Sequence, residues 1–344
     1  MTYKRKLIIL SSLAAVLALL YVMTWVFDPE RSGRRSDAYA WLDSRLQDSV
    51  DGIDIQGGDS RRDLEELKLR RRNGAWLAVR EGEEYPARES RINDFLDELS
   101  RRDSYPQRSS SPSTHERFGL DDSRASRVTI RGGPGLPLLE LLAGNNDGAN
   151  IFLRKAQDNE VRSGRDRLSP YLAGGITSWF NLRLFPESEN DGITAESVQR
   201  LTVRPPAGEG ETGGDSGGEA PDSVPAGPVE ISRVQNSWRI TRGDFSLEPA
   251  DIEKTRVDSY ITGILNTVGD DFVSSGLPSE SASVTLELAD GRVLILQLGP
   301  PDEDSGQRLA AVSDSPYVYA LASWAVDRLF REPEYFRRSG DSAR

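Results

Sequence analysis

The chain has no cysteine and only one histidine among its 344 residues. Without cysteine there is no disulfide, no thiolate nucleophile and no cysteine-ligated zinc or iron–sulfur centre. His115 is the one imidazole that a metal site or a histidine-based catalytic step could use. We therefore predict no catalytic, cofactor-binding or metal-binding residues, no cofactor and no enzymatic activity.

Positive charge is also in deficit. Lys and Arg total 43 against 55 Asp and Glu, which gives a net charge of -12. Such a chain repels phosphate backbones, and this argues against nucleic acid as the partner. The basic run at residues 70–72 is interpreted as a solvated strand face. With 37% hydrophobic residues the chain can bury a core, and its length predicts about two domains.

Residues 7–27 form an uncharged apolar run near the N-terminus, preceded by Lys4, Arg5 and Lys6. A helix of this length spans roughly 30 Å, the thickness of the hydrocarbon core of a bilayer. Asp28-Pro29 would end it. We predict a cytoplasmic tail at residues 1–6, a transmembrane helix at residues 7–27 and a juxtamembrane segment at residues 28–47.

The orientation follows from the basic tail, which should stay inside and place the bulk of the chain outside the cytoplasm. A cleaved signal peptide is the alternative, because Ala38-Tyr39-Ala40 has the small-x-small form of a peptidase site. That triplet lies well beyond the apolar run, across Arg31, Arg34 and Arg35. A retained anchor is the favoured interpretation.

The rest of the chain contains an internal repeat with a period of roughly 150 residues. Each unit opens with an alternating strand, at residues 50–55 and 198–203, and its second strand carries a tryptophan, Trp76 or Trp238. A helix with an apolar stripe follows in each unit. The two stripes are Ile92, Phe95, Leu96 and Leu99, and Val257, Tyr260, Ile261, Ile264, Leu265 and Val268.

Short strands complete each unit, after Phe118-Gly119-Leu120 in one and Ser275-Gly276-Leu277 in the other. A meander of strands with one long helix predicts an α+β fold: a transmembrane helix, then two tandem repeated domains, each an antiparallel sheet with a covering helix. The repeats are placed at residues 48–186 and 192–338. The Gly-, Pro- and acid-rich segment 205–228 is expected to be a disordered hairpin loop of the second repeat.

The order and spacing of these landmarks resemble the bacterial family known as domain of unknown function 4340 (DUF4340). The elements that carry the resemblance are Asn73-Gly74-Ala75-Trp76, the helix at residues 92–99 and Phe118-Gly119-Leu120-Asp121-Asp122. The second unit departs from the pattern, with Ser275 in place of the aromatic residue. The resemblance implies an accessory protein of ABC-type transporters, including those linked to gliding motility, and no established catalytic residues.

Three functions follow as hypotheses. The first is a single-pass protein of the bacterial inner (cytoplasmic) membrane with its bulk on the periplasmic side. It would be an accessory or scaffold protein of an ABC-type export or gliding-motility-like assembly. Its partners would be the lipid bilayer, through residues 7–27, and a membrane-embedded complex such as an ABC transporter permease. The second is an extracytoplasmic ligand-binding module that uses the cleft between the two repeats.

The third hypothesis is a serine hydrolase, because Gly213-Gly214-Asp215-Ser216-Gly217-Gly218 contains the string found around the nucleophile of chymotrypsin-like proteases. That chemistry needs a rigid turn, an oxyanion hole and a histidine held by an aspartate. Here the string lies in an acidic, Gly-rich segment, and His115 is interpreted as an exposed loop residue. Chance occurrence of the string is favoured over a hydrolase.

Other candidates also have simpler interpretations. Trp76 and Trp238 are interpreted as core anchors and not as a binding platform. Two acidic clusters, Glu81, Glu83, Glu84 and Asp302, Glu303, Asp304, lack the spacing of a calcium loop and predict solvated turns. Gly132-Gly133-Pro134-Gly135 lacks the lysine of a phosphate loop and predicts a hairpin turn.

Overall fold

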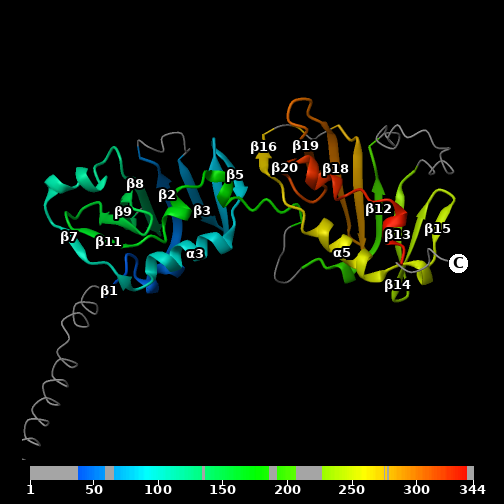
Figure 1. Cartoon of the computed structure of the whole chain (residues 1–344), viewed down its shortest axis with the longest axis horizontal. Coiled ribbons are helices and arrows are strands. Elements are labelled where there is room, and N and C mark those ends of the chain that lie inside the picture. Colours follow the sequence, from blue (N-terminus) through cyan, green and yellow to red (C-terminus); the bar gives the residue numbers. More distant parts are fainter. Residues whose placement is uncertain are drawn as a thin grey trace, which may run out of the picture. The chain divides into compact units, whose positions relative to one another are not determined.

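The computed structural model describes residues 38–58, 66–133, 136–185, 192–206, 227–274, 276 and 279–338. The chain divides into two compact units, Met1–Trp179 and Phe180–Arg344 (Figure 1). The stretch 186–191, where the sequence suggested a boundary, lies outside the described residues.

The first unit is built on a nine-stranded antiparallel sheet in the order β5-β4-β3-β2-β8-β9-β10-β11-β7. A separate two-stranded sheet pairs β1 with β6. The strands are β1 (Ala38–Tyr39), β2 (Val50–Gln56), β3 (Leu67–Arg72), β4 (Ala75–Arg80), β5 (Glu83–Pro86), β6 (Asp103–Ser104), β7 (Gln107–Ser109), β8 (Ser126–Gly132), β9 (Leu136–Asn146), β10 (Asn150–Lys155) and β11 (Val161–Arg165). The helices are α3 (Glu89–Ser100) and α4 (Ser169–Leu172), with 3-10 turns η1 (Ser44–Ser49), η3 (Pro112–Thr114), η4 (Glu116–Phe118) and η5 (Ile176–Trp179).

The second unit has a nine-stranded antiparallel sheet in the order β15-β14-β13-β12-β17-β18-β19-β20-β16. Its strands are β12 (Val198–Arg204), β13 (Val229–Val234), β14 (Ser237–Arg242), β15 (Phe245–Leu247), β16 (Asp271–Val273), β17 (Ala282–Leu288), β18 (Val293–Pro301), β19 (Arg308–Val312) and β20 (Val318–Leu321). The helices are α5 (Lys254–Leu265) and α6 (Ser323–Asp327), with 3-10 turns η6 (Ala195–Ser197), η7 (Pro249–Asp251) and η8 (Pro333–Phe336). Replacing each strand of the first sheet by its counterpart in chain order gives this second order, so the two units share one topology.

The long helices form because each has one apolar face that the sheet buries (Figure 1). In α3 the buried residues are the four of the predicted stripe, and this prediction is confirmed. In α5 the buried residues are Val257, Tyr260, Ile261, Ile264 and Leu265. Val268 was predicted in the same stripe, and this was wrong: α5 ends at Leu265, and Val268 is 42% exposed beyond it.

The closing 3-10 turn of each unit is tied to the start of its long helix in the same way. The amide of Arg88 donates to the carbonyl of Trp179 at 2.7 Å, and that of Glu253 donates to the carbonyl of Phe336 at 2.9 Å. The two aromatic side chains pack on the helix, with ring centroids 5.7 Å apart for Phe95–Trp179 and 5.2 Å for Tyr260–Phe336. The C-terminal segment of each unit is therefore fixed over its long helix.

The predicted α+β class is wrong, because the described part of the chain is mostly β-structure. Each of the two large sheets has nine strands, whereas α3 and α5 have twelve residues each and α4 and α6 only four and five. The edge strands escaped prediction because they are short and polar, as in Glu83–Pro86 and Gln107–Ser109. Backbone pairing, and not an apolar pattern, holds such strands in the sheet.

The predictions of a transmembrane helix and of a single-pass membrane location also need correction. Within the residues that the structure describes, no helix is both long and apolar enough to cross a membrane. The run at residues 7–27, on which both predictions depended, lies outside those residues.

Candidate functional site: a groove in the second unit

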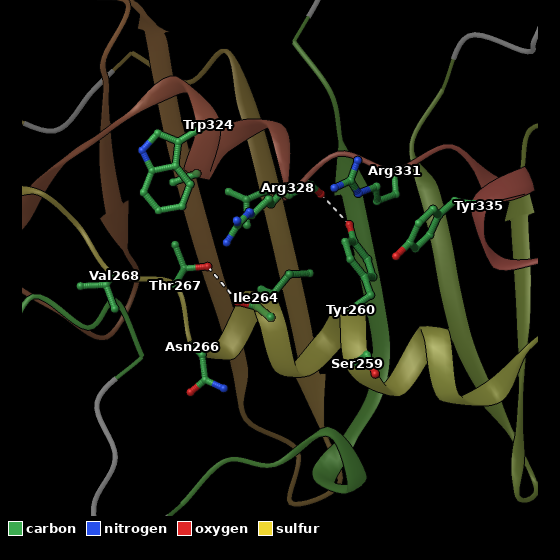
Figure 2. Close-up of a pocket in the computed structure, with 13 residues that line it drawn as sticks. Ser259, Tyr260, Ile264, Asn266, Thr267, Val268, Trp324, Arg328, Arg331 and Tyr335 are labelled. Atoms are coloured by element: carbon green, nitrogen blue, oxygen red, sulfur yellow. Dashed lines mark hydrogen bonds between the residues drawn. The ribbon is translucent and has the colours of Figure 1, made fainter.

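A groove of about 290 Å³ lies between the C-terminal half of α5 and the segment from α6 to η8 (Figure 2). Tyr260, Gly263 and Ile264 of α5 form one side, which is called the floor of the groove. Trp324 of α6 and Arg328 face them from the other side. Thr267 and Val268 close one end, and Arg331 and Tyr335 lie at the opposite end.

A comparison of the two units shows why this position is open in the second. When the first residues of α4 and α6, Ser169 and Ser323, are aligned, Tyr171 of the first unit corresponds to Ala325 of the second. The Tyr171 ring fills the space over α3, with centroids 5.2 Å from Phe95 and 6.1 Å from Trp179. Ala325 has no such ring and lines the groove instead.

The segment that follows the short helix is also longer in the second unit. It runs from 169 to 179 in the first unit and from 323 to 336 in the second, so three residues are added before the closing aromatic. Arg328, Leu329 and Arg331 lie in this extended segment and line the groove. The loss of one ring and the longer segment together produce the groove.

Tyr260 fixes the floor of the groove and is not free to react. Its side chain is buried, and its hydroxyl donates to the carbonyl of Leu329 at 2.5 Å. Burial raises the pKa of the Tyr260 phenol well above its usual range. The phenol stays protonated and ties the extended segment to α5.

The end of α5 is closed by hydrogen bonds within the helix and leaves open space beside Gly263. Thr267 donates its hydroxyl to the carbonyl of Gly263 at 3.2 Å, and the amides of Asn266 and Thr267 donate to the carbonyls of Thr262 and Ile264. These bonds satisfy carbonyls that a helix end leaves open. A Cβ atom on Gly263 would meet nothing within 4 Å. No packing contact of the described chain therefore requires glycine at this position.

The rim of the groove is aromatic and cationic. Trp324 is 58% exposed and Tyr335 is 48% exposed. The Arg328 guanidinium lies 4.8 Å from the centroid of the Trp324 ring, and that of Arg331 lies 5.3 Å from the centroid of Tyr335. Neither arginine has an ion pair with a carboxylate among the described residues. Each guanidinium is held by a ring face and keeps its hydrogen-bond donors available.

His115 is not the exposed loop residue that the sequence suggested. It is 9% exposed, and its Nε2 lies 3.2 Å from the carbonyl oxygen of Asn159. Its own carbonyl accepts from the amides of Phe118 and Leu120. The interpretation was wrong because local sequence does not show that the loop at residues 156–160 lies against this turn. His115 has a structural role there.

The motif around Gly119 is a buried structural turn. Gly119 has a positive φ of 66°, and a Cβ on it would lie 2.3 Å from the Asn145 side chain, so only glycine fits. Leu120 is fully buried, and its carbonyl accepts from Nε and Nη2 of Arg154 at 3.2 and 3.1 Å. The Asp121 carboxylate accepts from the hydroxyl of Ser123 at 2.5 Å.

Trp76 and Trp238 are core residues, as the sequence indicated. Both are buried, and Trp238 is fully so. The Trp238 indole donates to a carboxylate oxygen of Asp258 at 2.9 Å, and the Arg233 guanidinium lies 4.2 Å from its ring centroid. The hydrogen bond ties β14 to α5, and the ring contact ties β14 to Arg233 of β13.

The remaining candidates are dispersed or lie outside the described chain. Ser216 and Pro134-Gly135 fall outside the described residues. Glu84 pairs with Arg72 and Arg70 pairs with Asp54, while Asp302 accepts from the amide and hydroxyl of Ser305. Nowhere in the described part of the chain do three or more His, Asp or Glu residues gather as metal ligands.

The fold and the groove define a β-rich protein of two like-folded units, the second of which carries an open apolar groove with a cationic rim. The chain belongs to the family described as Domain of unknown function (DUF4340), whose model matches residues 76–275. That match runs from β4 of the first unit to two residues beyond β16 in the second. Comparisons with the curated proteins and with the solved structures gave no match.

Sequence reasoning placed Tyr260, Ile264 and Val268 in an apolar stripe and missed every other residue of the groove. The available signal was weak: a glycine within the apolar stripe of a helix, and aromatic residues close to arginines at residues 324–335. Neither shows that the two segments face each other across a hollow.

Proposed function

We propose that this protein is a non-catalytic accessory or scaffold protein that binds a partner protein through the groove of its second unit. One observation carries the proposal. Of the five large apolar side chains exposed in the described part of the chain, Val268, Trp324 and Tyr335 line this one groove. Exposed apolar side chains that gather at one place are typical of interaction sites, whereas scattered ones need no explanation.

The chemistry of the lining favours binding over catalysis. The lining residues, all within the described part of the chain, include no Asp, Glu, His or Lys. Ser259 and Thr267 contribute hydroxyls, but such a hydroxyl needs a neighbouring base to act as a nucleophile, and the described lining residues offer none. The hydroxyl of Tyr260 already donates a hydrogen bond to a backbone carbonyl. Trp, Tyr and Arg are the residues enriched where binding energy is concentrated in protein interfaces.

The resemblance of the sequence to its family supplies the first partner to test, a component of an ABC-type transporter. The test is co-purification after crosslinking from native cells, with the full-length chain as bait. A double variant, Trp324→Ala with Tyr335→Ala, should lose the partner that the unaltered chain recovers. Loss of both rings removes apolar contact area and the support of both arginines.

The matched control removes exposed apolar side chains elsewhere, as Leu46→Ala with Val293→Ala, both positions exposed and outside the groove. We expect this control to recover the partner in full. Equal recovery by the groove variant and the control would contradict a role for the groove. Recovery of nothing but the chain itself by the unaltered bait would contradict the scaffold proposal.

A further inference from the structure

The charge of the groove is opposite to that of the chain. The protein has a net charge of -12, yet the lining of the groove contains two arginines and no acidic residue. Figure 2 shows Arg328 extending toward α5 between Trp324 and Tyr260, and Arg331 above Tyr260. The apolar floor and the two guanidinium groups therefore belong to one surface.

We propose that the occupant of this groove is an acidic peptide segment of the partner, in which a large apolar side chain is flanked by Asp or Glu. The inference rests on the proposed function and names the chemistry of its partner. The apolar side chain would pack on Gly263 and Ile264 beside Trp324. The flanking carboxylates would pair with Arg328 and Arg331.

One physical argument matches the guanidinium groups to a carboxylate, and a second argues against a nucleic acid as the source of the anion. Guanidinium groups present paired N–H donors that match a carboxylate in geometry, and a ring face beneath each holds it in place before the ligand arrives. Phosphate groups share that chemistry, but a nucleic acid brings a long row of charges toward a chain of net charge -12. A short acidic segment meets the two arginines without that wider repulsion.

Gly263 adds an independent argument. Glycine within a helix is less favourable than alanine, because it loses more backbone freedom on folding. No neighbour in the described chain fills the space that its missing side chain leaves. The corresponding position of α3, counted from the start of each helix, is Glu98. A glycine here has no local structural reason, and its effect is to leave the floor of the groove open to a ligand.

The test measures binding of labelled peptides to the full-length protein by fluorescence anisotropy. The probes are a peptide with a central leucine or phenylalanine flanked by glutamates, the same peptide with lysines for glutamates, and one with glycine for the apolar residue. We expect the acidic apolar probe to bind at least tenfold more tightly than either control peptide. Its affinity should fall as salt is raised, because its carboxylates pair with exposed guanidinium groups.

Variants then locate the site. Arg328→Glu with Arg331→Glu should lower the affinity at least tenfold, whereas Arg204→Glu, an exposed arginine on β12 outside the groove, should leave it within twofold. Gly263→Leu should block the acidic probe, and Gly263→Ala should raise the melting temperature. The melting temperature of the alanine variant tests the open space beside Gly263 even if Gly263→Leu fails to fold.

Equal binding of acidic and lysine probes, or unchanged affinity in the double arginine variant, would overturn the acidic-peptide inference. Failure of all peptides to bind, while the Trp324→Ala and Tyr335→Ala variant still loses its partner, would overturn the inference alone and leave the proposed function standing. The proposed function itself would be contradicted by a different result, in which the unaltered chain recovers no partner.

Discussion

At the residue scale, the two matching tryptophans show how a repeat position gains different contacts in each unit. Trp238 donates to Asp258, which is also paired with Lys254 at 2.5 Å, so the indole joins a strand, a helix and an ion pair. Trp76 is buried at the same position of the first unit. The sequence identified both as core residues, but only the fold revealed the carboxylate partner.

We predict that Trp238→Ala lowers the free energy of unfolding by about 3 to 5 kcal/mol, the usual cost of removing a large buried side chain. Trp238→Phe should cost less, because it keeps an aromatic ring and loses mainly the indole hydrogen bond. The matched control is Trp324→Ala, an exposed tryptophan of the same unit, with an expected change within about 0.5 kcal/mol. Urea unfolding followed by circular dichroism measures all three. A similar loss for Trp238→Ala and Trp324→Ala would contradict the assigned burial.

Asp121 provides a prediction for pH. The hydrogen bond from Ser123, together with Arg124, lowers the pKa of the Asp121 carboxyl to about 2. A depressed carboxyl pKa contributes stability above its unfolded value of about 3.9, and that contribution disappears as the pH falls through the folded value. Asp121→Asn should therefore destabilise the protein at pH 6, and its difference from the unaltered chain should shrink between about pH 4 and pH 2. Asp122→Asn, at the exposed neighbour, should show a smaller difference at pH 6. A difference for Asp121→Asn that stays constant down to pH 2 would contradict the assigned hydrogen bonds.

At the scale of elements, β12 and β13 are antiparallel neighbours, with Val203 opposite Val229. The segment between them, residues 207–226, lies outside the described residues. Its two flanks are therefore close in space although they are far apart in sequence. The sequence repeat had placed this segment between the first two strands of the second unit. The corresponding strands of the first unit, β2 and β3, are also antiparallel neighbours.

We predict that deletion of residues 207–226 changes the free energy of unfolding by only about 1 kcal/mol, because loop-closure entropy varies slowly with length. Replacement of the segment by a Gly/Ser sequence of the same length is the control that separates length from composition. The deletion also removes Ser216, so unchanged cellular function would weigh against the hydrolase hypothesis. A melting temperature lowered by many degrees in the deletion, with the replacement unaffected, would show that length matters more than this argument allows.

At the scale of the whole molecule, each unit has its own nine-stranded sheet, its own long helix and its own closing turn tied to that helix. A unit that has its own hydrophobic core, and whose strands pair only with strands of the same sheet, meets the requirements for independent folding. We predict that residues 38–179 and 180–338, produced separately, each unfold cooperatively near the temperature at which that unit unfolds in the full chain. Calorimetry of the two pieces and of the full chain measures this. A piece without a cooperative transition would show that its stability depends on the rest of the chain.

The sequence alone determined the family, the apolar faces of α3 and α5, the placing of both tryptophans in the core and the opening strand of each unit. These features depend on local periodicity and on short motifs in a fixed order, both of which can be read along one chain. It did not determine the class, because edge strands such as β7 and β16 are too short to carry a pattern. Nor did it place His115, whose burial depends on a loop distant in sequence.

The tertiary structure alone decided the groove. Its walls come from residues 259–268 and 324–335, and it is open because Ala325 stands where the first unit has Tyr171 and because three residues lengthen the segment above α5. Whether Trp324 and Arg328 are buried or exposed depends on how closely α5 approaches them in the folded chain. A pattern along the chain reports which face of an element is apolar, but not whether the neighbouring element covers that face fully.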